Sequence, residues 1–279
     1  MSDYARPQTL DQVLSLLAGG GWQVLGGGTD LYPLAGMRLP GRILDVSAVA
    51  EMSGITLGRT GGQGLRIGAA TTWAAIADAD LPPALNALRQ AARVVGGRQV
   101  QNAGTIGGNL CNASPAADGV PALLVLDAEV ELLSDQGTRR MRLGAFLRGP
   151  RQTTLRPGEI LSAVIIPDTA LRGQSAFIKL GARTHLVISI AMVAARLAVD
   201  AGRIVDAAIA VGSCSPVAVR LPLVEAALKG APLADAVERV RAADVRAALA
   251  PIDDVRATAA YRREAAVELV RRAVAGVLA

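Results

Sequence analysis

The sequence predicts an α+β protein made of two domains. Its 279 residues are enough for one large domain or two modest ones, because single cores stop growing near about 250 to 300 residues. Hydrophobic residues make up 51% of the chain and charged residues 19%, which is typical of a globular aliphatic protein. Strand and helix patterns are mixed up to residue 170, whereas three strand patterns followed only by helices come after it. We therefore expect domains over residues 1–170 and 171–279.

Apolar periodicity and helix or strand breakers predict the elements of the first domain. Expected helices cover residues 9–18, 72–78, 82–95 and 120–126, and expected strands cover residues 22–25, 42–46, 64–67, 129–133 and 159–166. Pro82 and Pro83 suit a helix start, and Pro167 ends the last strand. Residues 168–175 are the expected linker between the domains.

The second domain is predicted to begin with strands and to end with helices. Expected strands cover residues 176–180, 188–199 and 204–211, and the turn at residues 200–203 (DAGR) joins the last two as a hairpin. Expected helices cover residues 223–228, 233–242 and 255–278. Gly230 is a stop signal, and the acidic pair at residues 253–254 precedes the last helix.

The counts of cysteine and histidine exclude several kinds of chemistry. Cys111 and Cys214 are the only cysteines, so a cluster that needs about four thiolates must belong to another chain. His185 is the only histidine, which excludes zinc sites built on histidine pairs. We expect no metal site and no catalytic side chain here. Cys111 is predicted to be a buried apolar residue and His185 to be structural.

Charge and hydropathy exclude two further classes of function. The net charge is +5, but the arginines are scattered among acidic residues, and aromatics reach only 3%, so we expect no nucleic-acid partner. The longest apolar stretch, residues 186–195, is too short to span a membrane, which takes about 18 residues or more. The first residues contain no apolar signal core. The sequence therefore predicts a cytoplasmic protein.

A glycine-rich segment follows the expected strand at residues 22–25. Residues 25–31 read LGGGTDL, and three glycines let several backbone N–H groups approach an anion closely. The segment lacks the lysine and hydroxyl residue of a nucleotide-triphosphate P-loop, and Leu31 stands where a dinucleotide fingerprint needs its third glycine. A phosphate cradle of another fold is one interpretation, and a simple tight turn is the other.

A second glycine-rich segment, residues 104–109 (GTIGGN), is predicted to be a loop and leads into the polar stretch at residues 110–118 (LCNASPAAD). Two such segments in one domain suit a ligand with two polar regions, such as FAD. Asp118 would then bind the cofactor, although capping of the helix that follows is its alternative role.

At these segments the chain resembles the FAD-binding medium subunits of the molybdenum hydroxylases, the family of xanthine dehydrogenase, carbon monoxide dehydrogenase and 4-hydroxybenzoyl-CoA reductase. The resemblance rests on residues 27–31 (GGTDL), on residues 98–109 (RQVQNAGTIGGN) with the Ser-Pro at 114–115, and on Asp118. It continues in residues 177–183 (FIKLGAR), 188–189 (IS) and 254–263 (DVRATAAYRR), so it runs nearly end to end.

The resemblance implies a fold and a set of cofactor contacts. The first domain would be a two-lobed FAD-binding domain of the PCMH/VAO type, and the second a CO-dehydrogenase-flavoprotein-like C-terminal domain with a three-stranded antiparallel sheet and helices. The residues carried over as contacts of FAD are Val24, Leu25, Gly26, Gly27, Gly28, Thr29, Asp30, Leu31, Val95, Thr105, Ile106, Gly107, Gly108, Asn109, Asp118, Leu161 and Lys179. Lys179 is one of only two lysines among 29 basic residues.

The function implied is that of an oxidoreductase subunit. FAD would receive electrons from two-iron two-sulfur clusters of a small partner subunit, which takes them from the molybdenum cofactor of a large one, and would pass them to an external acceptor. The resemblance also implies that the three subunits assemble as a dimer of heterotrimers. Two alternatives stay open at this point: a stand-alone flavoprotein oxidoreductase related to vanillyl-alcohol oxidase and MurB, and a non-catalytic nucleotide-binding protein.

Overall fold

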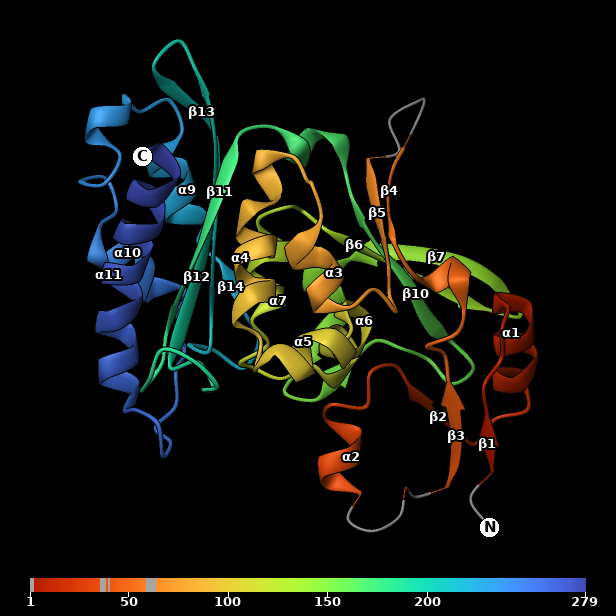
Figure 1. Ribbon diagram of the computed structural model, residues 1–279. Helices are drawn as coiled ribbons and strands as arrows, with labels where there is room; N and C mark the ends of the chain where they lie inside the picture. Colours follow the sequence, from red (N-terminus) through yellow and green to blue (C-terminus); the bar gives the residue numbers. More distant parts are fainter. Residues whose placement is uncertain (1–2, 36–38, 40, 59–63) are drawn as a thin grey trace.

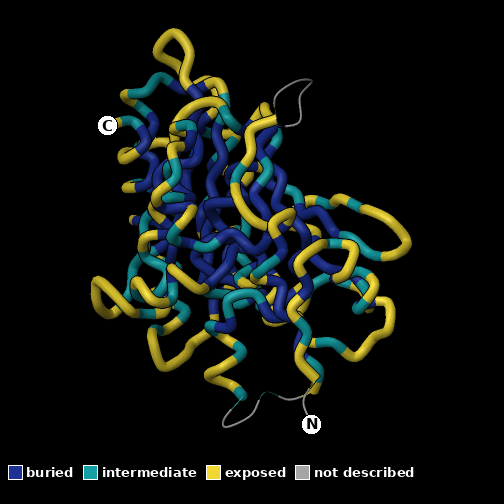
Figure 2. Tube along the Cα trace, turned by 45° about the vertical axis from the view of Figure 1, so that its right-hand side comes forward, coloured by how far each residue is buried: buried dark blue, intermediate teal, exposed yellow. Residues whose placement is uncertain are grey.

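The computed structural model describes residues 3–35, 39, 41–58 and 64–279. Figure 1 shows a small sheet, a larger central sheet and a third sheet, with helices packed between and beside them. Figure 2 shows that buried residues are concentrated where these layers meet. The α+β class predicted from the sequence is confirmed. No helix within the described residues is long and apolar enough to cross a membrane.

The first lobe is a small parallel sheet in the order β1-β3-β2. Its strands are β1 (Tyr4–Ala5), β2 (Trp22–Leu25) and β3 (Arg42–Asp45), joined by the helices α1 (Leu10–Ala18) and α2 (Leu31–Leu34). The Thr9 side chain accepts a hydrogen bond from the Gln12 N–H and so fixes the start of α1. Because β2 pairs in parallel with β3, a crossover connection must follow the end of β2 before β3 can begin. The first glycine-rich segment, residues 25–31, begins this connection.

The central sheet is antiparallel in the order β4-β5-β10-β6-β7. Its strands are β4 (Ile55–Leu57), β5 (Leu65–Gly68), β6 (Glu129–Ser134), β7 (Gly137–Arg142) and β10 (Ile160–Ile166). All seven residues of β10 are buried, which explains why this strand reads as a continuous apolar run. Three short elements precede strands of this sheet in sequence. The 3₁₀ helix η1 (Ala50–Met52) comes before β4, and the hairpin of β8 (Leu147–Gly149) and β9 (Gln152–Thr153) comes before β10.

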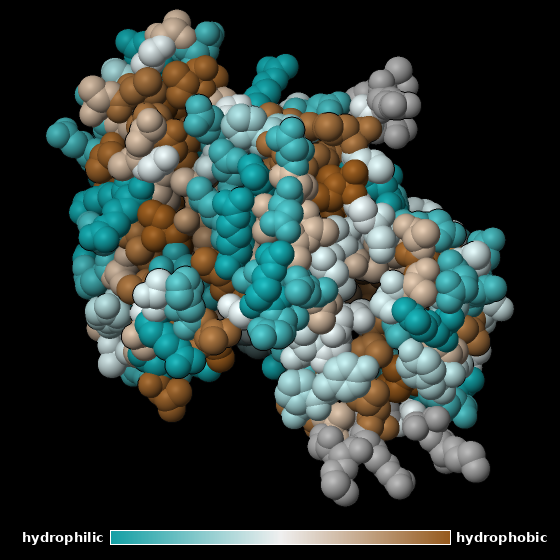
Figure 3. Space-filling view, in the orientation of Figure 1, coloured by the Kyte–Doolittle hydropathy of each residue, from teal (hydrophilic) through white to brown (hydrophobic). Residues whose placement is uncertain are grey.

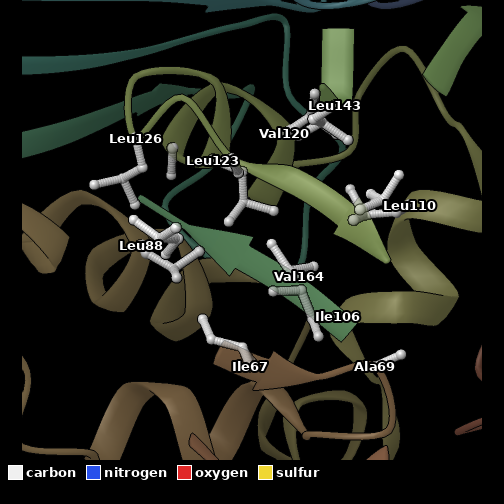
Figure 4. Close-up of a cluster of buried hydrophobic side chains, with 14 of the residues drawn as sticks. Ile67, Ala69, Leu88, Ile106, Leu110, Val120, Leu123, Leu126, Leu143 and Val164 are labelled. Atoms are coloured by element: carbon white, nitrogen blue, oxygen red, sulfur yellow. The ribbon is translucent and has the colours of Figure 1, made fainter. Parts of the chain in front are cut away.

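Helices cover this central sheet and build the main core. They are α3 (Trp73–Asp78), the 3₁₀ helix η2 (Pro83–Leu85), α4 (Asn86–Val94), α5 (Arg98–Ala103), α6 (Ile106–Asn112), α7 (Gly119–Leu124) and α8 (Leu143–Phe146). Figure 4 shows how Ile106 and Leu110 of α6, Leu123 of α7 and Val164 of β10 point toward one another. This core holds α6, and therefore the second glycine-rich segment, firmly in place.

The third sheet has the order β11-β12-β13-β14 and is antiparallel. Its long strands are β11 (Gln174–Leu180), β12 (Ala191–Asp200) and β13 (Arg203–Gly212), and β14 (Val219–Arg220) adds a two-residue fourth strand. In the turn between β12 and β13, Ala201 and Gly202 both have positive φ, which confirms the predicted hairpin.

The third sheet is buried on both faces. Met192 and Ala194 of β12 belong to the core that contains α4 and α7, whereas the alternate residues Val193 and Ala195 belong to a second core. That second core is closed by α9 (Pro222–Leu228), α10 (Ala242–Ala247) and α11 (Ala259–Leu278), with the 3₁₀ helix η4 (Leu233–Asp235) between them (Figure 1). The helices α4 and α7 thus connect the central sheet to the third one.

Several expected elements differ from the structure. Residues 104–109 are not a loop, because Thr105 caps α6 by accepting the Gly108 N–H. The helix expected at 82–95 is divided into η2 and α4, and residues 168–175 form the 3₁₀ helix η3 (Asp168–Leu171) and the start of β11. Residues 188–190 precede β12 rather than belonging to it. The strand β7 was not predicted because it is an exposed edge strand in which arginines occupy three of the six positions.

Two expected helices near the C-terminus also differ from the structure. Residues 233–241 contain only η4 and turns, and the helix α10 begins at Ala242. The last helix begins at Ala259 rather than at residue 255, because the Asp254 carboxylate accepts the N–H groups of Arg256 and Ala257 and holds them in a turn. Thr258 then caps the helix through the Tyr261 N–H.

A buried arginine connects the third sheet to the helical layer, and its loss should destabilise the chain. The Arg196 side chain is 2% exposed, and its guanidinium donates to Val125 O at 2.8 Å, to Arg172 O at 3.3 Å and to Asp206 at 2.7 Å. In Arg196→Met two carbonyl oxygens lose their donor, so the free energy of unfolding should fall by about 2 to 3 kcal/mol in urea denaturation. The exposed Arg203→Met is the matched control, expected to change it by less than about 0.5 kcal/mol. Equal effects of the two variants would contradict this role for Arg196.

Candidate functional site

A cavity of about 380 Å³ lies between the first lobe and the helices α5 and α6. One wall is the glycine-rich segment after β2, and the other is formed by residues of α5, α6 and Trp73. Figure 3 shows the surface hollowed between this lobe and the rest of the molecule. The two glycine-rich segments of the sequence therefore face one cavity.

Glycines allow these two walls to touch. A Cβ atom on Gly27 would overlap the carbonyl group of Ala103, and one on Gly26 would lie 2.8 Å from Thr105 Oγ1. Gly28 has φ +69°, and a Cβ there would overlap the Tyr32 ring. We expected these glycines to let the backbone approach an anion. Their contacts show that Gly26 and Gly27 first of all pack the first segment against the second.

The first segment presents a row of backbone donors. Within the described part of the chain, the N–H groups of residues 26–31 donate no hydrogen bond, and the next one, Tyr32 N–H, donates to Gly28 O. All six residues line the cavity. Buried or half-buried N–H groups are normally paired, so such a row is the chemistry of an anion-binding site. The tight-turn interpretation alone does not account for it.

The second segment is a packed wall rather than a second cradle. Most of its N–H groups are occupied: Ile106 donates to Thr71 O, Gly107 to Ala69 O and Asn109 to Thr105 O. A Cβ on Gly108 would meet only Thr105 Oγ1, at 3.0 Å, so this residue leaves free space toward the cavity. Asn109 Oδ1 is buried and has no hydrogen-bond partner among the described residues. The wall therefore offers both room and an unused acceptor to a ligand.

A smaller cavity of about 110 Å³ adjoins the larger one, and five residues line both of them: Val24, Gly26, Thr105, Gly108 and Cys111. Its other walls are mostly apolar and include Met52, Leu155 and Leu161. A polar cradle next to an apolar cavity fits a ligand that carries both phosphates and flat rings. FAD, which has both, fits the residues present.

Most of the predicted cofactor contacts surround these two cavities. The larger one is lined by Val24, Leu25, Gly26, Gly27, Gly28, Thr29, Asp30, Leu31, Val95, Thr105, Gly108 and Asn109, and the smaller one by Gly107 and Leu161. Ile106, Asp118 and Lys179 line neither, and Ile106 is fully buried in the core.

Asp118 and Lys179 bind each other behind the cavity. Lys179 Nζ lies 2.6 Å from Asp118 Oδ2 and donates to Val94 O at 3.2 Å, and the Ser189 hydroxyl donates to Asp118 Oδ1 at 2.6 Å. Burial raises the pKa of Asp118, although the Lys179 ammonium group counteracts it. Asp118 makes no side-chain cap to α7, so the capping alternative is wrong. The pair instead ties β11 to the chain next to Val95, a residue of the cavity wall.

Sequence reasoning missed several residues of the larger cavity: Gln23, Leu34, Trp73, Val100, Gly104, Cys111, Asn112 and Arg151. Most of them adjoin a recognised segment, so proximity in sequence was a usable signal. Arg151 lies on the β8–β9 hairpin, far from either segment, and no motif indicated it. Cys111, expected to be buried in the core, is exposed to the cavity. The surrounding protein still raises the pKa of its thiol to about 12.

The structure also places two further side chains of the second domain. Arg262, near the start of α11, is only 3% exposed. Its guanidinium donates to Ile190 O, Ser213 O and Asp254, and so fixes the start of α11 to the end of β13. His185 is exposed in the segment between β11 and β12.

Comparisons with known proteins agree with this geometry. Residues 1–169 match the family described as the FAD binding domain in molybdopterin dehydrogenase, and residues 176–277 match the CO dehydrogenase flavoprotein C-terminal domain. The chain is 34% identical to a putative xanthine dehydrogenase FAD-binding subunit of Escherichia coli K12, over 83% of this chain and 80% of that one. It is 31% identical to the carbon monoxide dehydrogenase medium chain of Afipia carboxidovorans, over 98% and 95%. In the crystal structure of quinoline 2-oxidoreductase from Pseudomonas putida 86, one chain superposes with a TM-score of 0.87 at 26% identity, over 99% and 96%.

Substitution of Gly108 should block the larger cavity without unfolding the chain. In Gly108→Val the new side chain enters the cavity, so we expect the Kd for FAD to rise about a hundredfold or more, measured by flavin fluorescence. The melting temperature should stay nearly constant, because a Cβ at this position meets only Thr105 Oγ1. Gly144→Val is the matched control, since a Cβ there meets only Leu124 Cδ2 at 3.8 Å, away from the cavity. Gly28→Val is also expected to lose FAD, but its positive φ makes it a less clean test. Full FAD binding by Gly108→Val would contradict the assignment.

Alkylation of Cys111 should report both its pKa and its position. Because only the thiolate reacts, the rate with iodoacetamide should keep rising between about pH 8 and pH 10 without a plateau. FAD should slow the reaction, since Cys111 lines both cavities. Mass spectrometry of the labelled peptide measures both effects, Cys111→Ala serves as the control, and this variant should itself retain FAD. A plateau near pH 8 would contradict the raised pKa, and labelling that FAD does not affect would show that the thiol does not face the FAD site.

Proposed function

The chain belongs to the family of FAD-binding domains of molybdopterin dehydrogenases, and from this premise we propose that it is the FAD-carrying electron-transfer subunit of a multi-subunit molybdenum hydroxylase. The observation that carries the proposal is the row of six N–H groups at residues 26–31, which have no partner among the described residues and lie on the wall of a cavity that adjoins an apolar one. FAD, when bound, accepts electrons from one partner and gives them to another.

The residues of this chain bind and orient the cofactor. The N–H groups of residues 26–31 hold the pyrophosphate, and the wall of Thr105, Gly108 and Asn109 confines it on the other side. The smaller cavity, with Leu161 in its wall, takes a flat ring of the cofactor. Lys179, paired with Asp118, would support Val94 and the neighbouring Val95 from behind the cavity wall.

The electrons come from partner chains. Two cysteines cannot ligate an iron–sulfur cluster, and the relatives are named as subunits or medium chains of larger enzymes. We propose that a small iron–sulfur subunit delivers electrons, that a large molybdenum-cofactor subunit carries out the substrate chemistry, and that they assemble in the cytoplasm as a dimer of heterotrimers. The relatives are named for different substrates, and the pocket for the substrate would belong to the large subunit.

The walls of the two cavities disfavour a stand-alone flavoprotein. Among the described residues that line them, the ionisable ones are Asp30, Cys111, Glu159 and Arg151. Glu159 is paired with Arg139 at 2.6 Å, and the Cys111 thiol stays protonated near neutral pH. Neither is a suitable acid or base for substrate chemistry, which requires a pKa near the working pH.

Co-expression with the cognate small and large subunits tests the proposal. We expect the three chains to purify together with about one FAD per copy of this chain. In the absence of oxygen, the visible flavin absorbance should disappear when the reduced small subunit is added. The absorbance should disappear much more slowly when the small subunit is left out. Binding of FAD without any association with these subunits would favour the stand-alone enzyme, and lack of FAD would contradict the proposal altogether.

A further inference from the structure

We propose that Arg151 provides the positive charge that binds the phosphates of the cofactor, an inference that rests on the proposed FAD site. Arg151 follows Pro150 in the turn between β8 and β9. Its backbone N–H donates to Ala113 O at 2.9 Å, and its guanidinium donates to Asn112 Oδ1 at the end of α6. Arg151 and Asn112 both line the larger cavity. The hairpin thus brings one arginine to the wall that the glycine-rich segments build.

The charges around the cavity favour this role. Among the described residues that line the larger cavity, Arg151 is the one cationic side chain, and Asp30 is the one carboxylate. Within the same described set Arg151 forms no ion pair, whereas Arg139 and Arg140 of the nearby strand β7 are paired with Glu159 and Glu131. A guanidinium that has only an amide partner keeps donors available for an anion.

The row of N–H groups at residues 26–31 needs a positive charge nearby to bind a pyrophosphate. The N–H groups of residues 26–31 are neutral dipoles, and the segment contains no lysine. The pyrophosphate of FAD carries two negative charges, and the nearby carboxylate of Asp30 repels it. An arginine fork binds phosphate oxygens with two charge-assisted hydrogen bonds, which are about twice as strong as neutral ones. Arg151 therefore complements the cradle in both charge and geometry.

The backbone of Arg151 indicates that its side chain is retained at a cost. Its φ is +59°, in the left-handed region that arginine rarely adopts and that glycine adopts freely. A turn that served only to connect β8 and β9 would be more stable with glycine at this position. Strained residues of this kind cluster at functional sites, where the side chain and not the backbone explains them.

Substitutions of Arg151 separate the effect of its charge on FAD affinity from the effect of its backbone conformation on stability. Arg151→Gly removes the guanidinium and fits the left-handed backbone, so its melting temperature should be equal to or above that of the wild type. Its Kd for FAD should rise on the order of ten- to a hundredfold, because a hydrogen bond to a charged group is lost. Its Kd for riboflavin, which lacks phosphates, should not change. Arg151→Lys should recover part of the FAD affinity, and the wild-type Kd should depend more steeply on salt than that of Arg151→Gly.

Arg148→Ala is the matched control. Arg148 is an exposed arginine three positions earlier, on the same hairpin, and does not line the larger cavity. This variant should bind FAD as the wild type does. Titration by flavin fluorescence measures all four proteins with both ligands.

Three outcomes would overturn the inference. If Arg151→Gly binds FAD with unchanged affinity, Arg151 does not contact the phosphates, although the proposed function stands. Equal losses of affinity for FAD and for riboflavin would mean that Arg151 only shapes the cavity. If Arg151→Gly fails to fold, Arg151→Lys decides, because a cation in that place must retain more FAD affinity than Arg151→Met. A wild-type chain that binds no FAD would instead contradict the proposed function itself.

Discussion

The site depends on one constraint, the contact of the first glycine-rich segment with the backbone of Ala103. At Gly27 no side chain fits, because even a Cβ atom would overlap that carbonyl group. This contact fixes the first lobe against α5 and α6 and forces residues 26–31 to pass along a cavity instead of folding onto themselves. Their N–H groups consequently have no partner among the described residues. These donors are therefore available to an anion that binds in the cavity.

The rest of the chain keeps this arrangement rigid. The helix α6 is capped by Thr105, directly in the cavity wall, and is held by Ile106 and Leu110 in the main core. The third sheet adds no residue to either cavity wall within the described residues, but packs against α4 and α7. Its Lys179 contacts Asp118 and Val94 O, and thereby fixes the chain next to Val95. The C-terminal part therefore supports the site from behind.

Much of the fold and of the site could be predicted from the sequence, and the limits have physical reasons. Regular periodicity located most strands and helices, since apolar side chains repeat with the period of the element that buries them. The sequence predicts a loop at residues 104–109 because glycines obscure a helix whose start is set by a threonine cap. Lys179 and Asp118 were expected at the cofactor, but they form an ion pair with each other. This pair depends on how β11 packs against the C-terminal end of α4, which no local sequence pattern reveals. Arg151 reaches the cavity through a hairpin far away in sequence, so only the folded chain shows it.

Amide hydrogen exchange of residues 26–31, measured by mass spectrometry with and without FAD, shows whether these N–H groups bind the phosphates of the cofactor. Without the cofactor these N–H groups have no partner among the residues that the structure describes, so they should exchange rapidly in spite of the rigid core around them. With stoichiometric FAD we predict strong protection of this segment, far above any change in the hairpin turn at residues 200–203, which lies outside both cavities. Rapid exchange that persists in the FAD-loaded protein would show that the phosphates bind elsewhere and would contradict the account.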